Sequence, residues 1–324
     1  MNNFAVTVLG TASALPMANK YPSAQVLSVQ GRLFLIDCGE ATQMQLRKAG
    51  VSFLKIEAIF LSHTHGDHVF GIFGLLSTMS MLGRTQALTI YAPSSFAPML
   101  DFIRTYYGEG VNFSIDFVPL EHEGVKVIYD SPYMKVQAFP LQHRVPCYGY
   151  LFSQQQPGLN VKKDKIETYH LSISEIAALK RGEDLVRKAG PLVEPCMENE
   201  YCPQSGTDEE LCLPNEEFTY YPYVPRSYAY CSDTRYFPEL ASWVKGVNLL
   251  YHEATYPEEM AEKAQMRFHA TASQAAQCAK EAGAERLMIG HFSSKYPDHQ
   301  IFLSQAQAVF PHTVLAKELE SYEI

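Results

Sequence analysis

The stretch KIEAIFLSHTHGDH, residues 55–68, places three histidines and an aspartate directly after an apolar run that predicts a buried strand. A turn after a strand can direct alternate side chains into one small cavity, and zinc binds imidazole nitrogen and carboxylate oxygen, usually with four ligands. We therefore expect one metal ion at His63 and His65. A second ion would bind Asp67 and His68. A histidine-rich surface turn is the alternative interpretation.

Three further candidate metal ligands follow strands much later in the chain. His143 lies in PLQHRVPCYGY, Asp233 in YAYCSDT and His291 in LMIGHFSSKY. Alone, such a histidine is more often a surface or core residue than a ligand, but an α/β sheet collects the residues that follow its strands at one edge. Together with residues 63–68, these three residues predict a site for two metal ions. Asp233 is the natural bridge, because a carboxylate can offer one oxygen to each ion.

The chain is acidic overall, and much of this acidity lies in one segment. Its 324 residues include 26 Lys or Arg and 35 Asp or Glu, which gives a formal net charge of −9. Eight of the acidic residues and no basic residue lie between Pro191 and Glu217, so the remainder of the chain is nearly neutral. Net charge therefore does not exclude a nucleic-acid partner.

Composition and length indicate a folded protein of the cytoplasm. Apolar residues make up 47% of the chain, which is enough for a sizeable core and too many for global disorder. The longest weakly polar run, 69–83, is shorter than the roughly 20 residues of a membrane span, so no membrane partner is expected. No basic residue precedes Lys20, which argues against a secretory signal. Seven cysteines without a framework spacing favour a reducing compartment.

Strands and helices alternate along most of the chain, as in an α/β domain. Apolar alternation and short apolar runs predict strands over 4–9, 25–29, 33–37, 55–61, 88–91, 228–231, 247–252 and 286–289. Helical spacing predicts helices over 41–48, 69–82, 94–107, 172–187 and 272–282. Thr271 precedes the last of these as a cap, and Gly283 ends it. We expect one domain, 1–324, with an inserted arm and acidic loop over about 152–226.

Six segments of the chain match one known family. They are HTHGDHVFGIFGLL (63–76), HRVPCYGY (143–150), YCSDT (230–234), LLYHEATY (249–256), FHATASQAA (268–276) and GHFSSKY (290–296). The first segment alone resembles the metallo-β-lactamase fold superfamily, and the six together resemble its ribonuclease Z family. The resemblance implies an α/β fold, an αββα sandwich of the metallo-β-lactamase type with an inserted arm. It also implies a zinc-dependent endonuclease that removes the 3′ trailer of precursor tRNA, usually as a homodimer.

The resemblance further implies a role for each candidate ligand. The seven ligands divide between two zinc ions, with His63, His65 and His143 on the first, Asp67, His68 and His291 on the second, and Asp233 on both. Asp67 would also orient or deprotonate the attacking water. Manganese and iron remain open as the native metal, because the same nitrogen and oxygen ligands hold them.

Hydrolysis of a phosphodiester also needs an acid for the leaving 3′-oxygen. His269 is the candidate because neither metal ion claims it, and Glu253 could orient it. His269 could instead pack near the start of a helix, and Glu253 could instead pair with a Lys or Arg. The neighbouring His252 points the other way in its strand and is expected to be structural.

Five other residues are candidates for a role at or near a metal site. Asp37 either accepts the free N–H of a ligand histidine or is a solvated turn residue. Cys231 is expected to pack in the core. A further group of cysteines fits no zinc-ligand spacing, so no third metal site is expected at Cys196, Cys202 and Cys212.

Three functions stay open at this point. The leading one is the endonuclease that acts on precursor tRNA. The second keeps both metal ions but acts on a small or cyclic phosphodiester. The third is a non-catalytic partner in an RNA-processing assembly, and the complete set of metal ligands argues against it.

Overall fold

The computed structural model describes residues 4–15, 17–107, 111–188 and 210–324. The chain divides into a large unit, residues 1–155 with 226–324, and a small unit, residues 156–225. Most of the acidic segment, 191–209, lies outside the described residues, and so do Cys196 and Cys202. The interpretation of the chain as one domain with an inserted arm stays a prediction.

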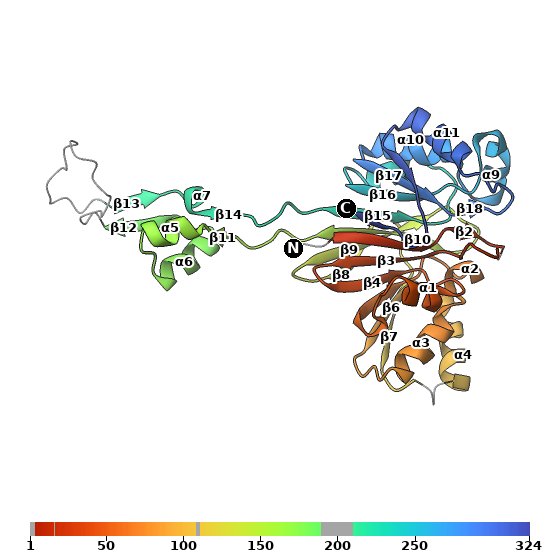
Figure 1. The fold of residues 1–324 in the computed structure, drawn as a ribbon, viewed down its shortest axis with the longest axis horizontal. Coiled ribbons are helices and arrows are strands. Elements are labelled where there is room, and N and C mark those ends of the chain that lie inside the picture. The colour runs from red at the N-terminus through yellow and green to blue at the C-terminus, as the bar shows by residue number, and fades with distance from the viewer. Residues whose placement is uncertain (1–3, 16, 108–110, 189–209) are drawn as a thin grey trace. The chain divides into compact units, whose positions relative to one another are not determined.

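The large unit contains two seven-stranded sheets that face each other (Figure 1). The strands of the first sheet lie, in spatial order, as β20 (Ser321–Glu323), β1 (Phe4–Gly10), β3 (Ala24–Val29), β4 (Arg32–Ile36), β5 (Ile56–Phe60), β6 (Leu88–Pro93) and β7 (Ile115–Leu120). Those of the second sheet lie as β19 (Thr313–Leu315), β17 (Arg286–Gly290), β16 (Leu249–Glu253), β15 (Ser227–Cys231), β10 (Cys147–Gln154), β9 (Met134–Leu141) and β8 (Lys126–Asp130). Strands β4 to β7 are parallel, as are β15, β16, β17 and β19.

Helices cover the outer face of each sheet, so the expected αββα sandwich is confirmed (Figure 1). The helices on the first sheet are α1 (Thr42–Lys48), α3 (Ile72–Met81) and α4 (Ala97–Tyr107). Those on the second sheet are α8 (Glu239–Trp243), α10 (Ala272–Ala282) and α11 (Gln300–Val309). Of two further short helices, α2 (Gly66–Val69) contains the predicted ligands Asp67 and His68, and α9 (Ala261–Arg267) ends two residues before His269. Within the described residues, no helix is long and apolar enough to cross a membrane.

Apolar alternation in the strands builds the layer between the two sheets. Alternate residues of β1, Phe4, Val6 and Val8, are buried in this layer. Aromatic side chains from both sheets meet there, and the rings of Phe60 and Phe152 pack edge to face at 5.2 Å. Full burial of such a side chain contributes about 1.5–3 kcal/mol, so this layer is a main source of the unit's stability.

Local sequence signals fix the ends of α10 as predicted. Thr271 forms a capping box with Gln274, and Gly283 ends the helix with a φ of 63°. The helix predicted over 69–82 is instead divided into α2 and α3. Gly71 lies at the break. Only glycine fits there, since a Cβ at this position would lie 2.0 Å from the carbonyl oxygen of Gly39. The helix predicted over 94–107 begins with a 3-10 turn over Ser94–Phe96.

The described part of the small unit forms two short antiparallel ribbons and three short helices. Strand β11 (Asn160–Val161) pairs with β14 (Thr219–Tyr220), and β12 (Leu185–Lys188) pairs with β13 (Glu210–Leu213). The helices are α5 (Lys163–Thr168), α6 (Ile173–Lys180) and α7 (Asn215–Phe218). Leu179 and Phe218 are fully buried at the centre of this unit, which therefore has its own small core.

The helix predicted over 172–187 is wrong in its second half. Ser172 caps α6 as expected, through a capping box with Glu175. The helix ends at Lys180, and Gly182 follows with a φ of 91°, which favours glycine. The chain then enters β12, whose partner strand starts more than 20 residues later. This distant pairing overrides the local helical pattern.

Candidate metal centre

The predicted metal ligands come from loops of both sheets. The structure brings together four residues that follow β5 and one residue each after β9, β15 and β17, namely His63, His65, Asp67, His68, His143, Asp233 and His291. Their ligand atoms form two groups, each within 4.8 Å: His63, His65, His143 and Asp233 in the first, and Asp67, His68 and His291 in the second. The grouping matches the division that the resemblance implies, while the roles of the residues as ligands stay a prediction.

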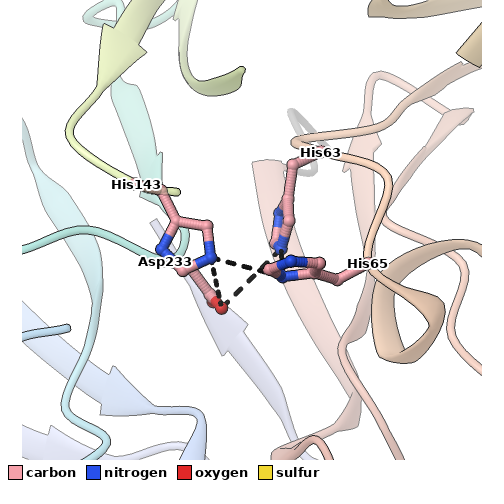
Figure 2. A group of neighbouring side chains, drawn as sticks. All are labelled: His63, His65, His143 and Asp233. Atoms are coloured by element: carbon pink, nitrogen blue, oxygen red, sulfur yellow. Dashed lines mark hydrogen bonds and ion pairs between the residues drawn. The ribbon is translucent and has the colours of Figure 1, made fainter. Parts of the chain in front are cut away.

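In the first group, three imidazoles and a carboxylate face one point (Figure 2). The Nε2 atom of His63 lies 3.0 Å from Nδ1 of His65 and 3.7 Å from Oδ2 of Asp233. The Nε2 atom of His143 lies 3.2 Å from Nδ1 of His65 and 3.8 Å from Oδ2 of Asp233. Ligands at zinc distances around a tetrahedral ion lie about 3.3 Å apart. The spacing of this group fits such an ion.

The second group has the same kind of spacing. The Nε2 atom of His68 lies 3.6 Å from Oδ2 of Asp67 and 3.4 Å from Nε2 of His291. The Nε2 atom of His291 lies 3.5 Å from Oδ2 of Asp67. Both imidazoles also approach Oδ1 of Asp233, at 3.5 and 3.3 Å. Asp233 thus presents Oδ2 to the first group and Oδ1 to the second, which is the arrangement of a bridging carboxylate.

The surroundings of Asp233 test whether the site fits a metal. This side chain is buried, and its Oδ1 accepts no hydrogen bond from the described residues. A buried carboxylate oxygen without a donor is costly unless a cation compensates it. Two divalent ions would supply that compensation, and five imidazoles and two carboxylates are a suitable ligand set for them. The residues present therefore fit a pair of metal ions.

Asp37 orients one of the candidate ligands through a hydrogen bond with the ring nitrogen that faces away from the site. It is fully buried, and its Oδ2 accepts a hydrogen bond from Nδ1 of His68 at 2.8 Å. The backbone N–H and hydroxyl of Ser62 and the hydroxyl of Tyr230 donate to the same carboxylate. Because Nδ1 of His68 is engaged in this contact, Nε2 is the ring atom that faces the site and would bind a metal ion. The alternative interpretation of Asp37 as a solvated turn residue is wrong.

Three other histidines of the site are oriented by residues that sequence analysis missed. Ser62 donates its hydroxyl to Asp37 and therefore accepts from Nδ1 of His63, 3.0 Å away. Thr255 donates to Glu253 and accepts from Nδ1 of His291 at 2.9 Å. The Nδ1 atom of His143 donates to the carbonyl oxygen of Phe268 at 2.9 Å. The available signal was their position near a predicted ligand or acid, because Ser62 and Phe268 directly precede His63 and His269, and Thr255 follows Glu253 by two residues.

The buried Glu253 and the half-buried His269 form a pair beside the two groups. The Nδ1 atom of His269 donates to Oε1 of Glu253 at 2.8 Å. The other oxygen of this carboxylate accepts from the backbone N–H and the hydroxyl of Thr255, and Oε1 also accepts from the N–H of Thr234. Among the described residues Glu253 has no Lys or Arg partner, so that alternative is wrong. His252 is buried and belongs to neither ligand group.

His269 faces the ligand groups. Its ring lies 5.2 Å from that of His143 and 5.7 Å from that of His291. Burial alone would lower the pKa of His269, but the carboxylate of Glu253 outweighs it and raises the pKa to about 9. A ligand atom of His269 also falls into a third group with Asp233 and His291. Its assignment as an acid, separate from the ligands, stays a prediction.

Charge and burial act in opposite directions on the imidazoles of the site. Burial is the main cause that lowers the pKa of His63, together with the neighbouring His68. Burial also disfavours the charged form of His68, but the carboxylates of Asp233 and Asp67 outweigh it and raise its pKa to about 10. The site therefore concentrates negative charge on the side of the second group, where a divalent cation would meet it.

A cavity of about 300 Å³ opens beside the first group. His65, His143 and His269 form part of its wall. The candidate acid and one ligand group thus face the same space, so a substrate in this cavity would reach both.

Comparisons with known proteins agree with the fold and identify related sequences. A ribonuclease Z from Bacteroides fragilis is 38% identical over 318 residues, which cover 98% of this chain and 98% of that protein. The crystal structure of human tRNase Z, short form, superposes with a TM-score of 0.67 at 23% identity and covers 99% of both chains. The metallo-β-lactamase fold protein YhfI from Bacillus subtilis gives 0.66 at 19% identity over 99% of this chain and 100% of its own. A family model described as anti-Pycsar protein Apyc1 matches residues 4–104.

Proposed function

The chain belongs to the ribonuclease Z family, and on this premise we propose that it is an endonuclease that removes the 3′ trailer of precursor tRNA. The observation that carries the proposal is the pair of ligand groups that share Asp233 through different oxygens beside a cavity. A pair of neighbouring divalent ions suits the hydrolysis of a phosphodiester. Whole-chain similarity to a ribonuclease Z favours tRNA over a small or cyclic phosphodiester as the source of that bond.

The proposed cofactor is a pair of zinc ions in each chain. The first ion would be held by His63, His65 and His143, and the second by Asp67, His68 and His291, with Asp233 between them. When bound, such ions lower the pKa of water and offset the charge of the phosphate. Elemental analysis of purified protein identifies the metal and its stoichiometry, and it also tests manganese and iron.

The side chains around the ions would handle the protons of the reaction. Asp67 would orient or deprotonate the attacking water, since its carboxylate is held in place by the backbone N–H of Ala14 at 2.7 Å. His269 would donate a proton from its ring to the leaving 3′-oxygen, while Glu253 holds its Nδ1 atom. These transfers give a tRNA with a 3′-hydroxyl end and a trailer with a 5′-phosphate.

The direct test uses a precursor tRNA with a 3′ trailer and, in parallel, a chromogenic phosphodiester. We expect the purified protein to release the trailer, and the Asp67→Ala variant to lose this activity while it stays folded. Turnover of the small ester alone would support the second function, a phosphodiesterase for small or cyclic substrates. Absence of bound metal, with unchanged RNA binding by Asp67→Ala, would support the third function, a non-catalytic partner.

The proposal extends to a homodimer in the cytoplasm. The dimer follows from the family resemblance, and light scattering after size-exclusion chromatography measures it directly. Five cysteines lie in the described residues, and none of them forms a disulfide there. Free thiols are typical of a reducing compartment, which supports a cytoplasmic location.

A further inference from the structure

Four basic side chains surround the cavity beside the metal centre. Arg144 directly follows His143, Lys263 and Arg267 lie on α9, and Lys295 follows His291 by four residues. The two residues on α9 are spaced by one helical turn, so they project from the same face of the helix. The cavity wall contains no aspartate or glutamate. In a chain with a net charge of −9, this is a local concentration of positive charge.

None of these four cations is used to stabilise the fold through an ion pair. Within the described residues, the ion pairs of Lys and Arg side chains involve Arg32, Arg104, Arg181, Arg187 and Lys317. The ammonium group of Lys263 instead lies over the ring of Tyr256, 5.5 Å from its centre, and Tyr256 also forms part of the cavity wall. Arg144, Arg267 and Lys295 are exposed. Four cations without carboxylate partners are therefore available to a ligand.

The chemistry of the wall selects an anionic ligand with several charges. A single phosphodiester carries one negative charge, which the proposed metal ions would already offset. The basic side chains add four positive charges around the same space, and these suit further phosphates on either side of the scissile one. A nucleic-acid strand presents several phosphates in succession, whereas a small or cyclic phosphodiester has only one.

We propose that Arg144, Lys263, Arg267 and Lys295 form a binding subsite for the phosphates of the RNA strand next to the scissile bond. This inference rests on the proposed function and specifies how the substrate is held there. The phosphates belong either to the trailer or to the tRNA strand that precedes the cleavage point. Either source presents the same chemistry to the four side chains, and the substrates of the test separate them.

The test compares single and double variants on two substrates. Lys263→Gln and Arg267→Gln each raise KM for a precursor tRNA by about five- to tenfold, and the double variant raises it further. Hydrolysis of bis(p-nitrophenyl) phosphate, which has one phosphate, stays within twofold of wild type. The slope of log KM against log salt concentration falls by about 0.7–0.9 for each phosphate contact removed.

Lys245 provides the matched control. It is an exposed lysine that precedes the start of β16, at the opposite end of that strand from Glu253, and it is absent from the cavity wall. Lys245→Gln removes the same charge from the chain and leaves KM and the salt slope unchanged. A rise in KM in this control equal to that of the α9 variants would mean that only net charge matters, and this would overturn the subsite.

Trailer length identifies the source of the phosphates. If the defect of the double variant disappears with a one-nucleotide trailer, the cations hold the trailer. If it persists unchanged, they hold the strand before the cleavage point. Equal losses on the precursor and on bis(p-nitrophenyl) phosphate would overturn the subsite. Failure of the wild-type protein to cleave any precursor would instead overturn the proposed function, so the two failures are distinguishable.

Discussion

Two of the cavities in the described residues, one in each unit, have opposite chemistry. The cavity of the large unit, beside the metal centre, has four basic residues in its wall and no acidic one. The cavity of the small unit, about 470 Å³, has Asp184 and Glu216 in its wall and no Lys or Arg. The net charge of the whole chain describes neither of them.

The polar groups of the two cavities also differ in what they contact. In the small unit, Asp184 accepts a hydrogen bond from the backbone N–H of Asn215 at 2.8 Å, and Asn215 donates to two backbone carbonyls. These groups stabilise the start of α7. In the large unit, the four basic residues of the cavity wall have no carboxylate partner within the described residues, and Asp233 has an oxygen without a donor. Polar groups that lack partners indicate a binding site, whereas polar groups with partners indicate structure.

The largest expected effect comes from removing one carboxylate in each unit. Asp233→Ala eliminates the bridge between the two ligand groups, so bound metal falls below one ion per chain and tRNA cleavage falls by about 10³-fold or more. Asp184→Ala removes the acceptor for Asn215 and costs the small unit about 1 kcal/mol, with metal content and kcat unchanged. Elemental analysis and single-turnover cleavage measure both. Metal loss in Asp184→Ala would remove the contrast between the units.

The next effect concerns one histidine in each unit. His269→Ala keeps both metal ions but slows tRNA cleavage by about 10²-fold, because the leaving 3′-oxygen loses its acid. With a p-nitrophenyl ester, whose leaving group needs no proton, the same variant is nearly as fast as wild type. His170→Asn in the small unit, which suits the φ of 47° there, leaves both rates unchanged. If His269→Ala also loses metal, this residue is a ligand.

A smaller effect on metal affinity is expected when a buried aspartate is replaced, and none when an exposed aspartate is replaced. Asp37→Asn weakens the orientation of His68 and lowers metal affinity by about 10- to 100-fold. Competition with a chelator of known affinity measures this change. Asp164→Asn, at an exposed position in the first turn of α5, leaves the affinity unchanged. Equal affinities in wild type and Asp37→Asn would show that the hydrogen bond to His68 does not tune the site.

The smallest effect lies within the small unit and depends on pH. A hydrogen bond from Arg187 lowers the pKa of Glu175 from an ordinary value of 4.5 to about 2. The folded state thus favours the carboxylate, so this stabilisation is complete above about pH 4.5 and is lost as the pH falls toward 2. About a quarter of each side chain is exposed, which limits the contribution to less than about 1 kcal/mol.

Hydrogen exchange in α6 and β12 measures this contribution. After correction for intrinsic rates, wild type exchanges a few-fold faster at about pH 3.5 than at pH 7. Arg187→Gln has the faster exchange at both pH values, because the pair is already absent. The metal centre provides the contrast, since exchange near β5 is the same in both proteins at pH 7.

The sequence predicted the elements whose signals are local. Thr271 and Gly283 mark the ends of α10 because caps and left-handed stops depend on neighbouring residues alone. The seven candidate ligands were found because their residue types follow predicted strands. The second half of the helix predicted over 172–187 failed, since β12 depends on pairing with a strand far along the chain.

The parts of the site that were missed depend on tertiary contacts. Ser62 and Thr255 have ordinary local surroundings, and only the fold shows which imidazole each one orients. The basic wall was also invisible, because Arg144 and Lys295 are separated by about 150 residues and the overall charge is negative. Scattered residues of one charge reveal a common surface only when the chain is folded.

The origin of the ligands in both sheets has a mechanical consequence. His63 and His65 lie in the loop after β5 and Asp67 and His68 on the short helix α2 that follows it, while His143, Asp233 and His291 follow strands of the opposing sheet. Metal ions bound by residues of both sets would cross-link the two sheets at this edge of the sandwich. Binding that occurs only when the chain is folded adds to its stability in proportion to the logarithm of metal concentration. Removal of the metal ions by a chelator is therefore expected to destabilise this edge of the sandwich before the rest of the large unit.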